Sequence, residues 1–209
     1  MTRFQIHATL FVTVLLLVSA SSVSALDLGG HDRDGTVIGL TLGYGWNSIE
    51  YTKEGSIPRD TGNIGSFTGG FRVGWASSDY FIASIGFYGW RRDYYTFTPT
   101  STKAYAFMLE GYFFPLGEGF WVKGGVGRGT LDFYAKAAMP INDVIFNETA
   151  WSWSTGAGYE FRVSDGAGIG ISYDFLYIPV GDFGEINNNK FHDVSSISHS
   201  LSLNIHFYM

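Results

Sequence analysis

Apolar and polar residues alternate with a period of two along most of the chain, which places successive side chains on opposite faces of a strand. In the segment 36–47, Leu40, Leu42 and Tyr44 share one face, and Thr41 lies on the other with several glycines. The same alternation recurs in seven further segments: 67–76, 80–92, 104–114, 120–134, 150–163, 167–178 and 195–209. No helical period of comparable length competes with it, so the pattern predicts eight strands.

The connections between these segments alternate between long and short. The long ones are 48–66, 93–103, 135–149 and 179–194, and the short ones are 77–79, 115–119 and 164–166. This order predicts antiparallel neighbours, with all long connections at one end of the sheet. Transmembrane barrels have this layout, with short periplasmic turns and longer extracellular loops.

The two faces of the predicted strands differ in side-chain size. One face carries mostly Gly, Ser, Thr and Ala, which suit the inside of a narrow barrel, and the other carries bulky apolar residues, which suit lipid. Aromatic residues near the strand ends predict two interfacial girdles. The periplasmic girdle comprises Trp75, Tyr80, Phe81, Phe113, Phe120, Phe161 and Phe207, and the outer one Trp46, Trp90, Tyr105, Trp151 and Tyr177. A soluble barrel with an aromatic core is the alternative.

The N-terminus has the plan of a secretory signal peptide. Arg3 precedes an apolar run at 8–18, and small residues follow up to Ala25. The run of 11 residues is shorter than the roughly 20 that a spanning helix needs, although a membrane anchor is the alternative. We therefore expect a cleaved signal peptide at 1–25, a short N-terminal segment at 26–35 and a barrel at 36–209.

Composition excludes several other classes of protein. The chain of 209 residues has no cysteine, 18% aromatic and only 15% charged residues, and a formal net charge of −6. Disordered chains are poor in aromatics, and disulfide scaffolds and cysteine-ligated metal sites need cysteine. Nucleic-acid binding is disfavoured because 13 basic residues face 19 acidic ones. We expect no cofactor and no metal site.

The last predicted strand carries the most specific resemblance to a known family. Leu201, Leu203, Ile205 and Phe207 alternate towards the C-terminus, where Met209 stands in place of the family's terminal aromatic residue. The chain resembles the small eight-stranded outer-membrane β-barrels of the OmpA/OmpX-like outer membrane protein β-barrel domain group. The resemblance implies an all-β, single eight-stranded antiparallel up-and-down transmembrane β-barrel in the outer membrane of a Gram-negative cell. It also implies contact with outer-membrane lipids and lipopolysaccharide, and recognition of the last strand by the barrel assembly machinery.

Six charged residues fall on the small-residue face and therefore point into the predicted barrel. They are Arg72, Glu110, Lys123, Glu160, Arg162 and Asp174, three of each sign. Buried charges must be paired. The predicted strand of Lys123 is adjacent to the strands of both Glu110 and Glu160. An eight-stranded barrel is just wide enough for side chains to fill. We therefore expect a salt-bridge plug, with a narrow pore lined by these groups as the alternative.

No catalytic residues emerge from the sequence. Some small outer-membrane barrels modify lipid A, and the deacylase family carries a His-x-Ser motif on a lipid-facing strand. Here His199 is followed by Ser200 on the opposite face, and Ser195 lies roughly 13 Å along the strand. His199 is expected near the outer headgroups, with a catalytic base or a lipopolysaccharide contact as the alternative. The sequence thus favours a structural or surface-interaction protein with four extracellular loops and an unknown ligand, followed by a narrow solute channel and a lipid A acyltransferase or deacylase.

Overall fold

The computed structural model describes residues 33–53, 59–60, 64–94, 100–117, 119–136, 142–186 and 189–209. The predicted signal peptide and most of the segment 26–35 lie outside these residues. Among the described residues no helix is long and apolar enough to cross a membrane. The strands are β1 (Gly35–Lys53), β2 (Arg59–Asp60), β3 (Ile64–Ser78), β4 (Phe81–Tyr94), β5 (Thr100–Phe113), β6 (Phe120–Lys136), β7 (Asn142–Ser164), β8 (Ala167–Ile186) and β9 (Asn189–Tyr208).

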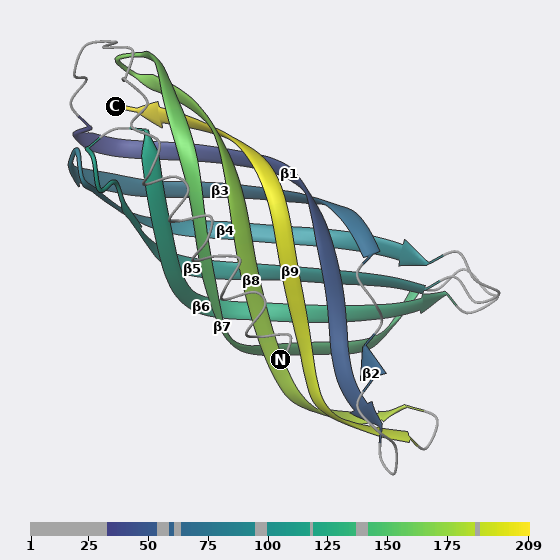
Figure 1. Cartoon of the computed structure of the whole chain (residues 1–209). Helices are drawn as coiled ribbons and strands as arrows, with labels where there is room; N and C mark the ends of the chain where they lie inside the picture. The colour runs from purple at the N-terminus through teal and green to yellow at the C-terminus, as the bar shows by residue number, and fades with distance from the viewer. Residues whose placement is uncertain are drawn as a thin grey trace, which may run out of the picture. The chain divides into compact units, whose positions relative to one another are not determined.

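The strands form one antiparallel sheet that closes on itself (Figure 1). Apart from the two-residue β2, which pairs only with β1, each strand pairs with its neighbours in chain order, and β9 returns to pair with β1. At the seam the Thr36 amide donates to the Met209 carbonyl at 2.8 Å, and the Met209 amide donates to the Thr36 carbonyl at 2.9 Å. The prediction of a closed eight-stranded, up-and-down antiparallel barrel is confirmed.

The strands are staggered around the barrel. Register partners followed once around the sheet lead from Ile38 through Val73, Ile85, Leu109, Val126, Trp153, Tyr177 and Ile197 to Ser48. The path returns to β1 ten residues from its start, which is the shear of the barrel. Closure with such a shear tilts strands by about 35–45°, and the interior of eight strands holds little more than side chains.

Several strands extend further towards the loop end than the sequence pattern indicates. The strand expected at 36–47 continues to Lys53, the one at 150–163 begins at Asn142, and the one at 167–178 continues to Ile186. Backbone hydrogen bonds sustain these extensions where the alternation fades, because a strand outside the lipid needs no apolar face. The connections between these strands are therefore shorter than the sequence pattern predicts.

The barrel is apolar outside and polar inside. Leu42 and Phe67 are 72% and 81% exposed, whereas the intervening lumen positions Thr41 and Ser66 are buried. Since the large apolar residues lie on the wall of every barrel strand, the predicted face assignment is confirmed.

Trp90 corrects the predicted outer girdle. It is only 5% exposed and packs inside the barrel with Ile49 and Leu131. Its position follows the alternation of β4, in which Phe87 points outward and Arg92 inward. The odd or even position of Trp90 in the alternation therefore predicts its face correctly, whereas its closeness to the strand end does not.

Candidate functional site

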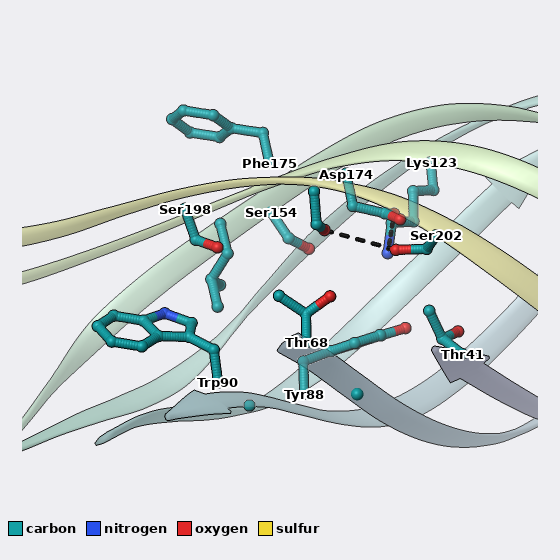
Figure 2. A pocket seen from close by; sticks show the side chains of 14 residues that line it. Thr41, Thr68, Tyr88, Trp90, Lys123, Ser154, Asp174, Phe175, Ser198 and Ser202 are labelled. Atoms are coloured by element: carbon teal, nitrogen blue, oxygen red, sulfur yellow. Dashed lines mark hydrogen bonds and ion pairs between the residues drawn. The ribbon is translucent and has the colours of Figure 1, made fainter. Parts of the chain in front are cut away.

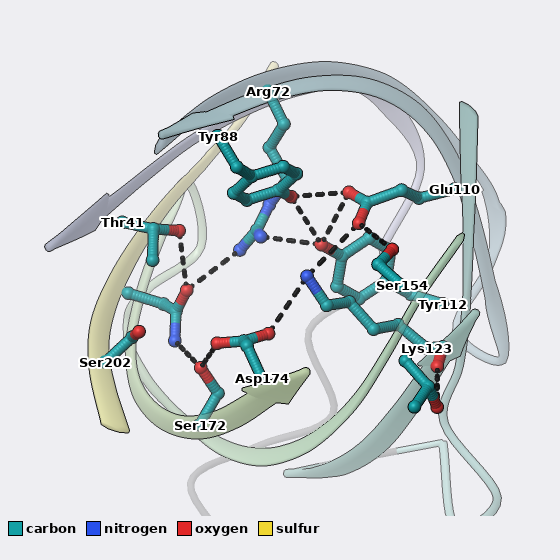
Figure 3. Close-up of polar contacts among 12 residues, drawn as sticks. Thr41, Arg72, Tyr88, Glu110, Tyr112, Lys123, Ser154, Ser172, Asp174 and Ser202 are labelled. Atoms are coloured by element: carbon teal, nitrogen blue, oxygen red, sulfur yellow. Dashed lines mark hydrogen bonds and ion pairs between the residues drawn. The ribbon is translucent and has the colours of Figure 1, made fainter. Parts of the chain in front are cut away.

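A buried ion pair triad crosses the lumen (Figure 3). The Lys123 ammonium, from β6, lies 3.1 Å from Glu110 Oε1 on β5 and 2.9 Å from Asp174 Oδ1 on β8. Ser154 on β7 donates to the same Glu110 oxygen at 3.2 Å. One cation therefore joins the two carboxylates of opposing walls.

Aromatic hydroxyls and a guanidinium complete the environment of Glu110. The hydroxyls of Tyr88 and Tyr112 donate to its Oε2 at 2.5 and 3.2 Å. Arg72, on β3, donates in turn to the Tyr112 hydroxyl at 2.6 Å, and its guanidinium carbon lies 4.8 Å from the centre of that ring. Lys123 Nζ lies 4.5 Å from the centre of the Tyr88 ring. Every charge in this part of the lumen thus has polar or aromatic partners.

Asn204 on β9 closes the circuit. Its Oδ1 accepts from Arg72 at 3.4 Å and from Thr41 at 2.8 Å, and its amide nitrogen donates to Ser172 Oγ at 2.8 Å. Ser172 then donates to Asp174 Oδ2 at 2.6 Å. The contacts form a continuous circuit, here called the lumen ring, through Arg72, Tyr112, Glu110, Lys123, Asp174, Ser172 and Asn204.

A second polar cluster surrounds Glu160 near the short turns. The carboxylate is buried and accepts from the Tyr208 hydroxyl at 2.9 and 2.8 Å, and it contacts the His206 ring. Arg33 and Arg162 approach it at 3.5 and 4.0 Å. Through Glu160 this cluster links Arg33, which precedes β1, with His206 and Tyr208 on β9.

Arg33 enters this cluster from just before β1. Its guanidinium donates to the Asp79 carbonyl at 3.1 Å and to the Gly117 carbonyl, and it stacks 3.9 Å from the centre of the Phe114 ring. Its own amide donates to Asp79 Oδ1 at 2.7 Å. Arg33 precedes the first strand and lies outside the alternating segments, so the sequence pattern could not indicate this role.

A small cavity lies between the lumen ring and the loop end of the barrel (Figure 2). Its volume is about 40 Å³, room for two or three water molecules. Lys123 and Asp174 line it together with Trp90. Much of the remaining lining bears hydroxyl groups, from Thr41, Thr68, Ser154, Ser198, Ser200 and Ser202.

Apolar clusters fill the barrel on both sides of the charged groups. The cluster towards the loop end comprises Ile49, Trp90, Ala104, Leu131, Ile178 and Val194. The cluster towards the short turns comprises Val37, Ala76, Ile82, Tyr112, Phe114, Trp121 and Tyr208. The described lumen is therefore packed along most of its length.

All six predicted lumen charges lie in these two clusters, but one predicted pairing is wrong. Lys123 is opposite Gly156 in the register, and Gly156 is opposite Asp174, so the lysine reaches Asp174. Glu160 lies four residues further along β7 and pairs with arginines instead.

The predicted balance of three positive and three negative charges is also corrected. Arg33 and Arg92 are buried inside the barrel as well, and Arg92 donates to the Asn47 carbonyl at 3.4 Å. The uncharged partners Tyr88, Tyr112, Asn204, His206 and Tyr208 were missed too. All five occupy lumen positions in the alternation, which was the signal that would have found them.

His199 lies on the outer wall, as predicted. Its Nδ1 is 2.5 Å from the Tyr173 hydroxyl, and its ring packs edge-on against Phe175. Ser198 and Ser200 are buried on the lumen side, so neither shares a face with this histidine.

The residues of the predicted assembly signal also face outward. Leu201, Leu203 and Phe207 are exposed on the wall, and Met209 follows the end of β9. Ile205 shares their face and is partly exposed. Their role in assembly remains a prediction.

The fold and its inverted polarity define a small outer-membrane β-barrel. The model of the outer membrane protein beta-barrel domain matches residues 13–207, and the chain belongs to that family. The protein is therefore an outer-membrane protein. No curated protein sequence matches the chain.

Two solved structures illustrate the likeness. The attachment invasion locus protein Ail of Yersinia pestis, in complex with the heparin analogue sucrose octasulfate, has 16% identity and a TM-score of 0.51 over 83% of this chain and 99% of its own. Neisserial surface protein A has 12% identity and a TM-score of 0.52 over 84% of this chain and 97% of its own. At these identities the likeness concerns the fold.

Proposed function

We propose that the protein is a non-enzymatic outer-membrane barrel whose closed lumen makes it a rigid, ion-tight support for extracellular loops. The loops then engage a partner outside the cell, since loops on a rigid scaffold commonly carry binding function. The observation that carries this proposal is the lumen ring, which joins side chains of β3, β5, β6, β8 and β9 without a gap.

Energetics support closure over conduction. A buried pair that loses one partner costs about 3–5 kcal/mol, because the remaining charge is left uncompensated. An ion that passed Lys123 would have to separate it from Glu110 or Asp174. The cavity of about 40 Å³ holds a few water molecules and ends against the cluster of Ile49 and Trp90.

Ion conductance in a planar lipid bilayer tests the proposal. The folded wild type should show no steady channels. A Glu110→Ala, Lys123→Ala double variant should conduct or leak, while Leu42→Ala on the outer wall should stay silent. Steady wild-type channels whose conductance changes in the double variant would establish the alternative, a narrow channel lined by these groups.

Lipid A modification is the enzymatic alternative. It requires a nucleophile, a base and an orienting group within hydrogen-bond reach. On the wall the Nδ1 atom of His199 lies against the Tyr173 hydroxyl, and the adjacent Ser198 and Ser200 point into the lumen. Lipid A masses from cells with and without the protein should therefore be identical, and a mass difference equal to an acyl chain would refute the non-enzymatic proposal.

Assembly of the barrel is proposed to depend on its last strand. The alternating wall residues Leu203, Ile205 and Phe207 present an apolar edge to the barrel assembly machinery before β9 pairs with β1. The departure at Met209 is expected to slow this recognition relative to a terminal aromatic residue.

A further inference from the structure

A single histidine connects the two polar clusters of the lumen. His206 lies on the lumen side of β9 and is only 2% exposed. Its Nε2 contacts Nη2 of Arg72, a member of the lumen ring, and its Nδ1 contacts Glu160 Oε2. The group near the short turns, here called the Glu160 cluster, is formed by Arg33, Glu160, Arg162 and Tyr208. The imidazole of His206 therefore joins the lumen ring to the Glu160 cluster.

Two glycines allow charged side chains to reach this imidazole. In the register His206 stands between Gly39 on β1 and Gly168 on β8. A Cβ atom on Gly39 would collide with the side chain of Arg72. A Cβ atom on Gly168 would lie 2.7 Å from Glu160 Cδ. Each charged side chain thus lies over a position where the lumen wall has no side chain, and His206 is held between a cation and a carboxylate.

The partners of His206 determine where its proton lies. A guanidinium can only donate hydrogen bonds, so the contact with Arg72 requires an Nε2 that carries no proton and accepts. The Glu160 carboxylate can only accept, so the Nδ1 atom must donate to it. In this arrangement His206 is a neutral imidazole with its single proton on Nδ1.

The groups around His206 come from every side of the imidazole. Arg72 reaches it from β3 and Glu160 from β7, whereas β1 and β8 place only glycines opposite it. On β9 the Tyr208 ring packs edge-on, with ring centres 6.2 Å apart. Arg33, from the segment before β1, lies 3.5 Å from the other oxygen of Glu160.

The charge balance of the two clusters opposes a second proton on His206. The four cations are Arg33, Arg72, Lys123 and Arg162, and the three carboxylates are Glu110, Glu160 and Asp174. A protonated His206 would add to this excess of positive charge and would place it directly against the Arg72 guanidinium. Buried charges that lack a compensating partner are costly, so the contact with Arg72 would be lost.

We propose that His206 is a proton-sensitive junction of the barrel. The neutral imidazole joins the lumen ring to the Glu160 cluster, and uptake of a proton from an acidic medium separates the two. Histidine is the side chain that ordinarily titrates between pH 5 and 8, so moderate acidification outside the cell reaches the relevant range. The inference goes beyond the proposed function, because it does not depend on whether the loops bind a partner.

The junction predicts a pH dependence of stability with a definite sign. Because it exists only with the neutral imidazole, its contribution is present at neutral pH. It is lost as the pH falls below about 6.5, where a histidine of the unfolded chain becomes charged. The folding equilibrium constant of the wild type should then fall by up to about tenfold per pH unit, the limit for a single proton.

Urea unfolding in liposomes between pH 7.5 and 5.5, read from the heat-dependent gel shift, tests this dependence. The amide of His206→Gln can accept from Arg72 and donate to Glu160 but does not titrate, so this variant should show a much flatter pH dependence than the wild type. His199→Gln is the matched control, because it removes the wall histidine of the same strand. This control should keep the dependence of the wild type.

Nitrogen-15 NMR of the imidazole tests the junction in the wild type without any substitution. At pH 7.5 the His206 side chain should carry a proton on Nδ1 alone, and it should become doubly protonated over the interval in which the barrel loses stability. Double protonation already at pH 7.5 would overturn the proposal. So would a His206→Gln variant with the pH dependence of the wild type, since the acid response would then belong to a carboxylate such as Glu160.

Discussion

At the scale of single residues, Glu160 shows how the lumen tolerates charge. Its carboxylate is fully enclosed and receives Arg33, Arg162 and the Tyr208 hydroxyl from three directions. The cations would each be costly to bury alone, and the carboxylate would be costly without them. The group therefore behaves as a unit that connects the segment before β1 with β9.

Glu160→Gln should destabilise the folded barrel by about 3 kcal/mol, because the buried Arg33 and the largely enclosed Arg162 lose the charge that compensates them. Urea titration of the protein in liposomes, read from the heat-dependent gel shift, measures the change. Glu148→Gln, at an exposed position of the same strand, should leave the midpoint unaltered. Equal midpoints for the wild type and Glu160→Gln would show that the cluster does not hold the barrel together.

At the scale of elements, β6 shows why one face of each strand is small. A Cβ atom on Gly127, which faces the lumen, would lie 2.0 Å from the Phe107 carbonyl oxygen and 2.8 Å from Met108 Cα on the neighbouring strand. A Cβ on Gly124, which faces outward, would meet nothing within 4 Å. Close approach of β5 and β6 therefore depends on the missing side chain at one glycine and not at the other.

Gly127→Ala should cost about 1–3 kcal/mol through overpacking against backbone, whereas Gly124→Ala should be close to neutral. Both variants change the same residue type on the same strand, so intrinsic propensity cancels between them. The yield of folded barrel after refolding into detergent, together with its unfolding midpoint, distinguishes the two. Equal loss in both would indicate that propensity, and not contact, decides the effect.

At the scale of the whole molecule, the barrel reverses the polarity of a soluble protein. Its apolar residues cover the wall, whereas charges, hydroxyls and a few water-sized spaces occupy the centre. Such an arrangement is stable only where lipid replaces water around the wall. The closed sheet leaves no unpaired edge among its eight long strands, which a bilayer requires.

Tryptophan quenching checks this polarity directly. In a variant that retains only Trp151, brominated lipid tails should quench the fluorescence strongly, because this ring lies on the wall. A variant that retains only Trp90 should be protected, since this ring packs inside against Ile49 and Leu131. Similar quenching of both would contradict the assignment of faces, and protection of both would place the wall away from lipid.

Much of the fold could be predicted because its determinants are local. The number of strands, their faces and the direction of Arg72, Glu110 and Lys123 all follow from alternation along single segments. Strand ends could not be predicted, because β1 continues to Lys53 on hydrogen bonds to its neighbours and not on its own pattern. Trp90 was assigned to the outer girdle because it lies near a strand end, although its position in the alternation places it in the lumen.

Alternation along each strand is enough to indicate which positions face the lumen and which face the lipid, because a period of two depends on one segment alone. Which of these residues contact one another depends on how the strands are aligned in the folded barrel. The register of β6, β7 and β8 brings Asp174, and not Glu160, to Lys123, and closure of the sheet brings Arg33 to Glu160 across the lumen. Contacts across a barrel depend on register and closure, and these are properties of all eight strands together.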